Sequence, residues 1–237
     1  MVVWWHALLT ALWGGLMALE RRAFLQAMVS RPLVAGAGTG FLLDDVVTGL
    51  YVGVVFELLH LGGVSLGGSH AHHETLPAVA AAAMASAMGH ASGSEGTPAM
   101  WSLSILLFAP SGWVGRRLEL RLDLRAAKYV GRARDATNVQ EFRRAARQNL
   151  RAMWPQFVFY GVLSGFACVL GYALAPLERE IPLGVLRGLA WAYPAMSVVA
   201  AAIAVQGSRA RGRSLIAGIS ALVVSVVAFV VWYRSAS

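Results

Sequence analysis

Long apolar segments, each close to the length of a bilayer crossing, constrain this chain more than any other feature. They occupy residues 3–19, 46–66, 99–115, 155–176, 182–205 and 214–233. A helix needs about 20 apolar residues to span the hydrocarbon core of a bilayer. Only 14% of the residues are charged and 57% are hydrophobic, whereas a soluble domain carries about 25% charge. The sequence therefore predicts an all-α integral membrane protein with about six or seven transmembrane helices.

Basic residues lie unevenly along the chain and predict its orientation. Arginine and lysine greatly outnumber acidic residues within 116–151, where leucines and aromatic residues recur at near-helical spacing. This pattern predicts one or two amphipathic helices, with a break at residues 138–140. The positive-inside rule places the segment at the cytoplasmic face, part of it on the anionic leaflet, and explains the charge without a nucleic-acid partner. Arg21, Arg22 and the arginines of 209–213 mark further cytoplasmic ends.

Two shorter segments, residues 32–43 and 77–88, are apolar but too short to span. Such pieces are typical of re-entrant or broken helices, which lie beside the substrate in transporters built from inverted repeats. The second segment is rich in alanine and is also suited to pack against a partner, because small side chains permit close helix contact in lipid. The polar residues 67–75 and 89–98 are predicted to form a turn and a flexible loop.

Residues 30–68 combine apolar length with ionisable groups and many glycines. Asp44, Asp45, Glu57 and His60 all lie within this stretch. Ionisable side chains are costly at membrane depth and persist mainly where they line a cavity, a substrate path or an ion path. Glycines let the backbone leave a helix or approach a ligand closely. The stretch is therefore the candidate functional site.

Asp45 and Glu57 each support two interpretations. Asp45 can accept hydrogen bonds from substrate hydroxyls, or it can cap the helix predicted to begin at Val46. Glu57 lies in an apolar run and must be paired, protonated or in contact with water. His60 is three residues further on, so one interpretation is a Glu–His pair that joins two helices. The other is a role facing substrate or protons.

An ordered series of residues in this region resembles a known family. The series is Glu20-Arg21-Arg22-Ala23-Phe24-Leu25-Gln26, Arg31-Pro32-Leu33-Val34-Ala35-Gly36, Asp45, Thr48-Gly49, Gly53, Glu57-Leu58, Leu61-Gly62 and Gly67. Over residues 18–68 it resembles the IIC subunit of the mannose-family sugar phosphotransferase system. The family has a glycine where this chain has Asp44. It has a Pro-Asp turn where this chain has His72-His73, which leaves Glu74 as the nearest carboxylate.

The resemblance implies a multi-pass subunit of the cell inner membrane that binds and moves a hexose or amino sugar. It implies contacts to the sugar from Asp45, Thr48, Glu57, Ser65, His73 and Glu74. The implied partners are a IID membrane subunit, soluble IIA and IIB phosphocarriers, the lipid bilayer and further copies of the chain in a homo-oligomer. Phosphoryl transfer would belong to IIB, so no catalytic residue, metal ion or cofactor is expected here.

The whole chain is expected to form one membrane-embedded IIC-like domain. Residues 1–115 would hold the substrate site and the re-entrant segments, 116–151 the basic cytoplasmic segment, and 152–237 three C-terminal spans. The sequence contains no P-loop, paired-cysteine motif or nucleophile elbow, which agrees with a transport subunit rather than an enzyme. The single cysteine, Cys168, excludes a disulfide within the chain.

Two other functions remain open. The altered His72-His73 turn is compatible with a regulatory or scaffold relic of the phosphotransferase system that no longer moves sugar. Asp45, Glu57, His60 and the histidines of 70–74 are compatible with a metal- or proton-coupled transporter. The metal signal is weak, since these histidines lack the i, i+4 spacing of a helical site.

Overall fold

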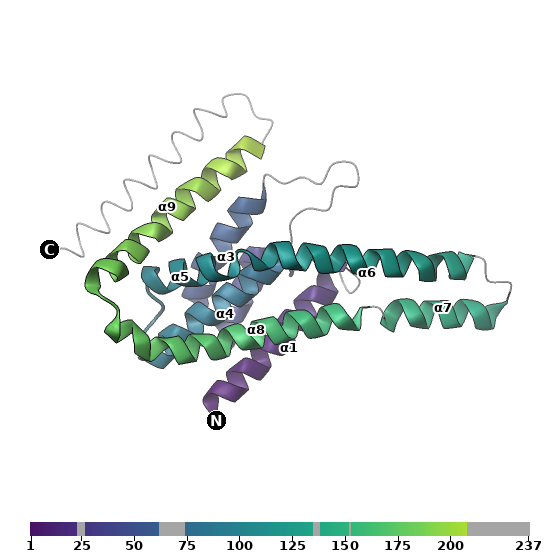
Figure 1. Cartoon of the computed structure of the whole chain (residues 1–237), viewed down its shortest axis with the longest axis horizontal. Helices are drawn as coiled ribbons and strands as arrows, with labels where there is room; N and C mark the ends of the chain where they lie inside the picture. Colours follow the sequence, from purple (N-terminus) through teal and green to yellow (C-terminus); the bar gives the residue numbers. More distant parts are fainter. Residues whose placement is uncertain (23–26, 62–73, 135–137, 152, 208–237) are drawn as a thin grey trace.

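A computed structural model of the chain describes residues 1–22, 27–61, 74–134, 138–151 and 153–207. The regular elements within these ranges are all helices, which confirms the predicted all-α class. They are α1 (Val2–Arg22), α2 (Pro32–Leu42), α3 (Val46–Leu61), α4 (Thr75–Ser92), α5 (Pro98–Phe108), α6 (Ser111–Arg134), α7 (Val139–Arg151), α8 (Trp154–Leu174), the 3-10 helix η1 (Ala175–Glu180) and α9 (Leu183–Gly207). Figure 1 shows one bundle, from which α6 and α7 extend as an arm.

Three described segments are long and apolar enough to cross a membrane: Val2–Arg21, Trp154–Glu180 and Leu183–Val205. Two shorter apolar helices, Pro32–Leu42 and Val46–Leu61, accompany them. This combination of long and short apolar helices is the architecture that the sequence predicts. The span predicted at 214–233 lies outside the described residues, as does the end of the span predicted at 46–66.

The helices α2 and α3 form a hairpin whose backbones touch along four glycines. Gly36 and Gly40 on α2 are four residues apart, as are Gly49 and Gly53 on α3, so each pair lies on one face of its helix. A Cβ atom added at Gly36 would lie 2.7 Å from the carbonyl oxygen of Gly49. One added at Gly53 would lie 2.7 Å from the carbonyl oxygen of Pro32. These glycines therefore serve close helix packing, the usual role of small residues in membrane interfaces.

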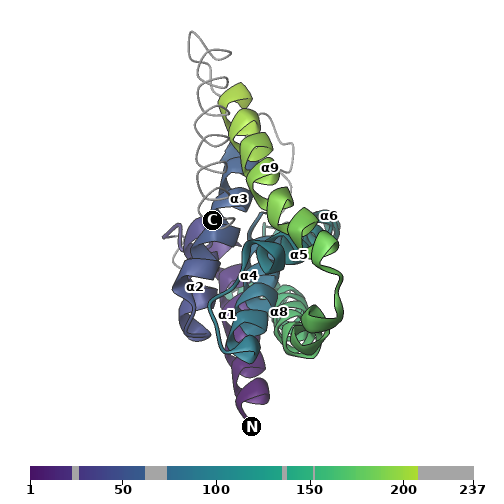
Figure 2. The same ribbon diagram turned by 90° about the vertical axis from the view of Figure 1, so that its left-hand side faces the viewer.

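The central element is α4, which packs against α8, α5, α2 and α3. Its residues Thr75 to Gly89 are all buried, and Figure 2 shows the other helices arranged around it. The sequence predicted a short segment over 77–88, whereas the helix has 18 residues and continues into the predicted loop as far as Ser92. The extension is held by tertiary contacts, since the His90 ring packs against His6 of α1 and Tyr172 of α8. The helix ends at Gly93, which takes the left-handed conformation with φ 73°.

The continuous span predicted over 99–115 is wrong. The chain instead forms α5, which ends at Phe108, and α6, which begins at Ser111. Pro110 lies between them and cannot donate the backbone hydrogen bond that a continuous helix requires. The Ser111 hydroxyl donates to the Phe108 carbonyl at 2.6 Å across this break.

A break between two amphipathic helices is observed, but it lies before the predicted residues 138–140, because Val139 and Gln140 already belong to α7. The α6 helix ends at Arg134 and α7 begins at Val139, with the intervening residues 135–137 outside the described ranges. The Asn138 side chain accepts a hydrogen bond from the Glu141 backbone at 2.9 Å and so caps α7.

Candidate functional site

The polar residues of the bundle gather at its two ends. We call the end that holds Arg21, Arg31 and the start of the arm the basic end. The positive-inside rule predicts that this end faces the cytoplasm. The other end holds the α2–α3 turn and the loop after α4, and we call it the opposite end.

Asp45 at the opposite end makes two hydrogen bonds to the backbone. One carboxylate oxygen accepts from the Thr48 N–H at 3.1 Å and so caps α3. The other accepts from the Gly96 N–H at 3.0 Å, in the loop between α4 and α5. The residue is only 7% exposed. Of the two interpretations of Asp45, the helix cap is therefore observed, and contact with a substrate stays a prediction.

Thr48 connects Asp45 to a cluster of aromatic side chains. Its hydroxyl oxygen accepts a hydrogen bond from the Trp101 indole N–H at 3.1 Å. The Trp101 ring stacks on Tyr51 with the centroids 4.3 Å apart, and it meets Tyr193 edge to face at 5.0 Å. The Tyr193 hydroxyl donates to the Tyr51 carbonyl at 3.0 Å. The cluster thereby joins α3, α5 and α9.

Asp44 lies beside this group in a left-handed conformation, with φ 58°. The resemblance places a glycine at this position, and glycine adopts this conformation without strain. Aspartate is among the few other residues that tolerate it. The turn between α2 and α3 therefore contains a left-handed residue at Asp44.

Glu57 at the basic end bonds to Arg31 and to the start of α2. One oxygen lies 3.4 Å from an Arg31 guanidinium nitrogen, and the other accepts from the Leu33 N–H at 3.4 Å. The Nδ1 atom of His60 is hydrogen-bonded to the backbone carbonyl oxygen of Phe56, one turn earlier on α3, at 2.8 Å. The partner of Glu57 is therefore Arg31 rather than the predicted His60, because the hairpin brings the N-terminus of α2 beside α3.

Glu74 also pairs with an arginine. Its carboxylate lies 3.1 Å from Arg21, which lies 3.6 Å from Glu119 on α6. Glu119 in turn accepts a hydrogen bond from Gln156 of α8 at 3.2 Å. Glu20 accepts from the N–H groups of Val29 and Ser30 at 3.2 and 2.9 Å. These contacts hold the ends of α1, α4, α6 and α8 together at the basic end.

The structure separates the predicted site residues into two groups. Asp45 and Thr48 lie at the opposite end, whereas Glu57 and Glu74 lie at the basic end. Asp45 and Glu57 are twelve positions apart on one helix, or about 18 Å at 1.5 Å per residue. Ser65 and His73 lie outside the described residues, in the segment between α3 and α4. In this conformation one sugar ring is too small to contact both groups.

Four residues that bind the predicted site residues were not predicted from the sequence: Arg21, Arg31, Gly96 and Trp101. The two arginines were visible as markers of orientation, but nothing local indicated which carboxylate each would meet. Gly96 and Trp101 are more than 50 positions from their partners. Among the described residues, no group of three His, Cys, Asp or Glu side chains is placed to hold a metal ion.

Comparison with protein families decides the class of this helical bundle. A family model described as the sorbose-specific IIC component of the phosphotransferase system (PTS) matches residues 4–207. The chain belongs to this family. The resemblance seen in the sequence is thereby confirmed. The chain is a membrane transport subunit of the PTS IIC family, in which other subunits carry out the phosphorylation.

Two solved structures are similar to this IIC chain. One, described only as a membrane protein, has a TM-score of 0.62 and 19% identity, and covers 99% of this chain and 95% of its own. It shows a shared fold over nearly the whole chain. The mannose transporter ManYZ in complex with microcin E492 has a TM-score of 0.45 and 20% identity, over 98% of this chain and 95% of its own. No curated protein matches the sequence.

Proposed function

We propose that this IIC chain binds and translocates a hexose or amino sugar, which a separate IIB subunit phosphorylates at the cytoplasmic face. The family match over residues 4–207 carries the proposal. Systems of the mannose family combine this subunit with a IID membrane subunit and with IIA and IIB. We propose the same partners here, together with a homo-oligomeric assembly in the inner membrane. The proposed domain is the whole chain, with the sugar site in residues 1–115.

The carboxylates of the basic end are the best-supported contacts for the sugar. Glu57 and Glu74 have side chains 15% and 20% exposed, so neither is sealed from an entering ligand. Each pairs with an arginine side chain, which can move away more easily than a backbone N–H, and the one backbone bond of Glu57, from the Leu33 N–H, is long at 3.4 Å. A carboxylate that accepts bonds from sugar hydroxyls forms charge-assisted hydrogen bonds, which are stronger than neutral ones. Ser65 and His73 lie in the sequence between these two residues and are proposed to complete the site.

Asp45 and Thr48 are proposed to contact the sugar at the opposite end of its path. Each carboxylate oxygen of Asp45 can accept more than one hydrogen bond, so the helix cap leaves capacity for a hydroxyl. The exposed ring of Tyr51 lies close by, stacked on Trp101. A sugar would meet this group first and the basic end later as it moves inward.

The Glu57→Gln variant tests the sugar site. The amide oxygen can still accept from the Leu33 N–H, so the fold and the association with IID should persist. Loss of the charged acceptor should weaken sugar binding by about 1–3 kcal/mol, or roughly one to two decades in affinity. Binding of labelled hexoses, glucosamine and N-acetyl sugars to the chain co-purified with its IID subunit measures this. Arg31→Gln is the matched control, because it removes the ion pair and keeps the carboxylate.

Two results would redirect the assignment. If neither Glu57→Gln nor Glu74→Gln reduces the binding of a sugar that binds the parent chain, the basic end is not the sugar site.

If a folded complex binds no sugar, the chain is a scaffold or regulatory relic of the system. The bonds from Asp45 and Glu57 to backbone groups favour this second candidate, because they give both residues a structural role. Thermal stabilisation by a metal ion, lost when His70, His72 and His73 are all replaced by alanine, would instead indicate the metal-coupled alternative.

A further inference from the structure

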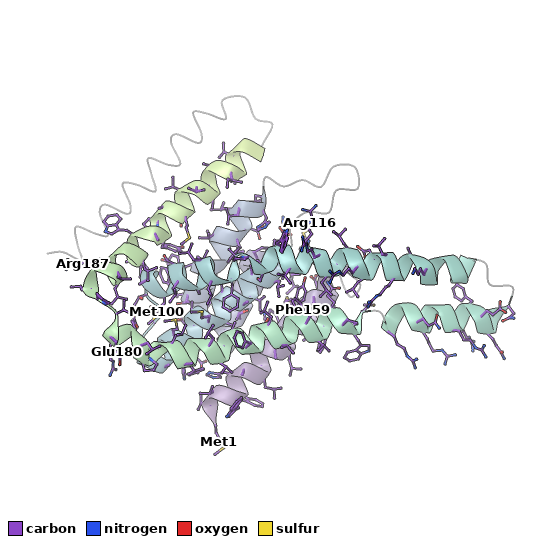
Figure 3. All side chains as sticks on the ribbon, viewed as in Figure 1. Met1, Met100, Arg116, Phe159, Glu180 and Arg187 are labelled. Carbon is purple, nitrogen blue, oxygen red and sulfur yellow. The ribbon has the colours of Figure 1, made fainter. Side chains whose placement is uncertain are left out.

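The arm, formed by α6 and α7, carries a surface that the proposed transport function does not use. The α7 helix packs against α6, and both extend away from the bundle (Figure 1). Figure 3 shows long side chains on α7 that project away from α6, with Arg116 near the place where α6 leaves the bundle. The exposed side chains of the arm form a basic row and an apolar row along each helix.

The first kind of row is basic. On α6 it consists of Arg117, Arg121, Arg125 and Lys128, and on α7 of Arg143, Arg147 and Arg151, all of them exposed. Spacings of three and four residues place the members of each row on one side of their helix. A continuous cationic edge on each helix fits a surface that carries many negative charges.

The second kind of row is apolar and lies beside the first. Trp113 and Leu124 on α6 are 51% and 70% exposed, and Val139 and Phe142 on α7 are 67% and 56% exposed. The Arg117 guanidinium lies 3.5 Å from the centre of the Trp113 ring, so the two rows meet there. Exposed apolar side chains edged by arginines are typical of helices that lie in a bilayer interface.

We propose that the arm binds the anionic headgroups of the bilayer, with its exposed apolar side chains inserted at the level of the headgroups. The base of the arm adjoins the bilayer, because α7 directly precedes the candidate span that begins at Trp154. Figure 1 shows α7 continuing close to the line of α8, so the proposed contact requires the arm to bend toward the lipid surface at the junction of α7 and α8. Trp154, the first residue of α8, is 61% exposed and suits the boundary between lipid and water. An acidic soluble protein would match the basic rows but would not need an exposed apolar row on both helices.

Spin labels at single cysteines test this proposal in the full chain. In a Cys168→Ala background, labels are placed at Leu124→Cys and Phe142→Cys. Gln148→Cys is the control, because it is exposed and lies half a turn from Val139 around α7. The chain is reconstituted in nanodiscs of phosphatidylcholine alone or with one quarter phosphatidylglycerol. With the anionic lipid, the labels at 124 and 142 should lose most of their accessibility to a water-soluble nickel chelate, and the label at 148 should keep it.

The basic rows should control this protection. Replacing Arg121, Arg125, Arg143 and Arg147 together by glutamine should restore the accessibility of the labels at 124 and 142. Equal accessibility at all three positions in both lipids would overturn the proposal and favour an acidic soluble partner. Hydrogen exchange of the unsubstituted chain provides a second measurement that needs no cysteine variant. Amides of 113–128 and 139–151 that exchange equally fast in both kinds of nanodisc would also overturn it.

Discussion

The carboxylates at the two ends of α3 are held in different ways. At the opposite end, both oxygens of Asp45 accept from backbone N–H groups, which are fixed by the helix and loop that carry them. At the basic end, Glu57 and Glu74 pair with the long side chains of Arg31 and Arg21, and Glu57 adds one long hydrogen bond from the Leu33 N–H at 3.4 Å. Asp45 is buried, whereas the Arg31 side chain is 43% exposed.

The difference indicates which carboxylates can change partner. A buried carboxylate bonded to backbone N–H groups leaves unsatisfied donors if it turns away, and each buried donor costs about 1–3 kcal/mol. A solvent-exposed ion pair contributes only about 0–1 kcal/mol. The pair of Glu57 with the 43% exposed Arg31 is nearer to that case than the pair of Glu74 with Arg21, which is 21% exposed. Asp45 is therefore expected to support the fold, and Glu57 and Glu74 are better suited to exchange an arginine for a ligand. The predictions below test this contrast, beginning with the largest expected effect.

Gly49→Ala should disrupt the packing of α2 against α3, which brings Arg31 beside Glu57. The added Cβ would overlap the carbonyl oxygen of Gly36, and a backbone atom cannot move aside as a flexible side chain can. We expect a loss of about 3 kcal/mol in stability, or failure to fold. Thermal unfolding of the detergent-purified chain measures this. Gly188→Ala on α9 is the control, because open space surrounds that position. Normal stability of the Gly49 variant would mean that α2 and α3 do not pack backbone to backbone at this position.

Asp45→Ala should be clearly more destabilising than Glu57→Gln. It leaves the N–H groups of Thr48 and Gly96 without their acceptor, at an expected cost of about 2–3 kcal/mol. The partly exposed Glu57 pair should cost less than about 1 kcal/mol. Thermal unfolding of both variants under the same conditions gives the comparison. Equal losses of stability would remove the proposed distinction between the two ends.

Thr48→Val should cost about 1 kcal/mol, because it removes the acceptor of the buried Trp101 N–H and keeps the shape of the side chain. The double variant Thr48→Val, Trp101→Phe removes both partners of this hydrogen bond. A double-mutant cycle with the two single variants measures their coupling. Strict additivity would show that the hydrogen bond does not connect α3 to α5.

Asp44→Gly should have the smallest effect, a gain of up to about 0.5 kcal/mol. Glycine relieves the strain of the left-handed turn but adds freedom to the unfolded chain, so the two terms partly cancel. Asp44→Ala should instead lower stability, because alanine adopts φ 58° less readily than aspartate. A variant Asp44→Gly that is less stable than the parent would indicate that the Asp44 side chain itself stabilises the turn.

The sequence predicted the local features of this protein. Apolar length predicted the spans now seen as α1, α8 and α9, and the short segment over 32–43 is α2. The arginine-rich stretch predicted one or two amphipathic helices, two are observed, and the Asn138 cap lies at the first residue of the predicted break. The effect of Pro110 could also have been predicted, since proline removes a helical hydrogen bond, but hydrophobicity over 99–115 concealed it.

The sequence by itself determined the class of the protein, a helical membrane subunit with its basic segments on one side, because hydrophobic length and charge act within each segment. The tertiary structure alone decided what each polar group contacts. It joined Asp45 to Gly96, Glu57 to Arg31 and Glu74 to Arg21, and it turned four glycines from apparent helix breakers into a packing surface. These contacts depend on how whole helices pack, since the partners lie between 26 and 53 positions apart and no local pattern records which surfaces will meet.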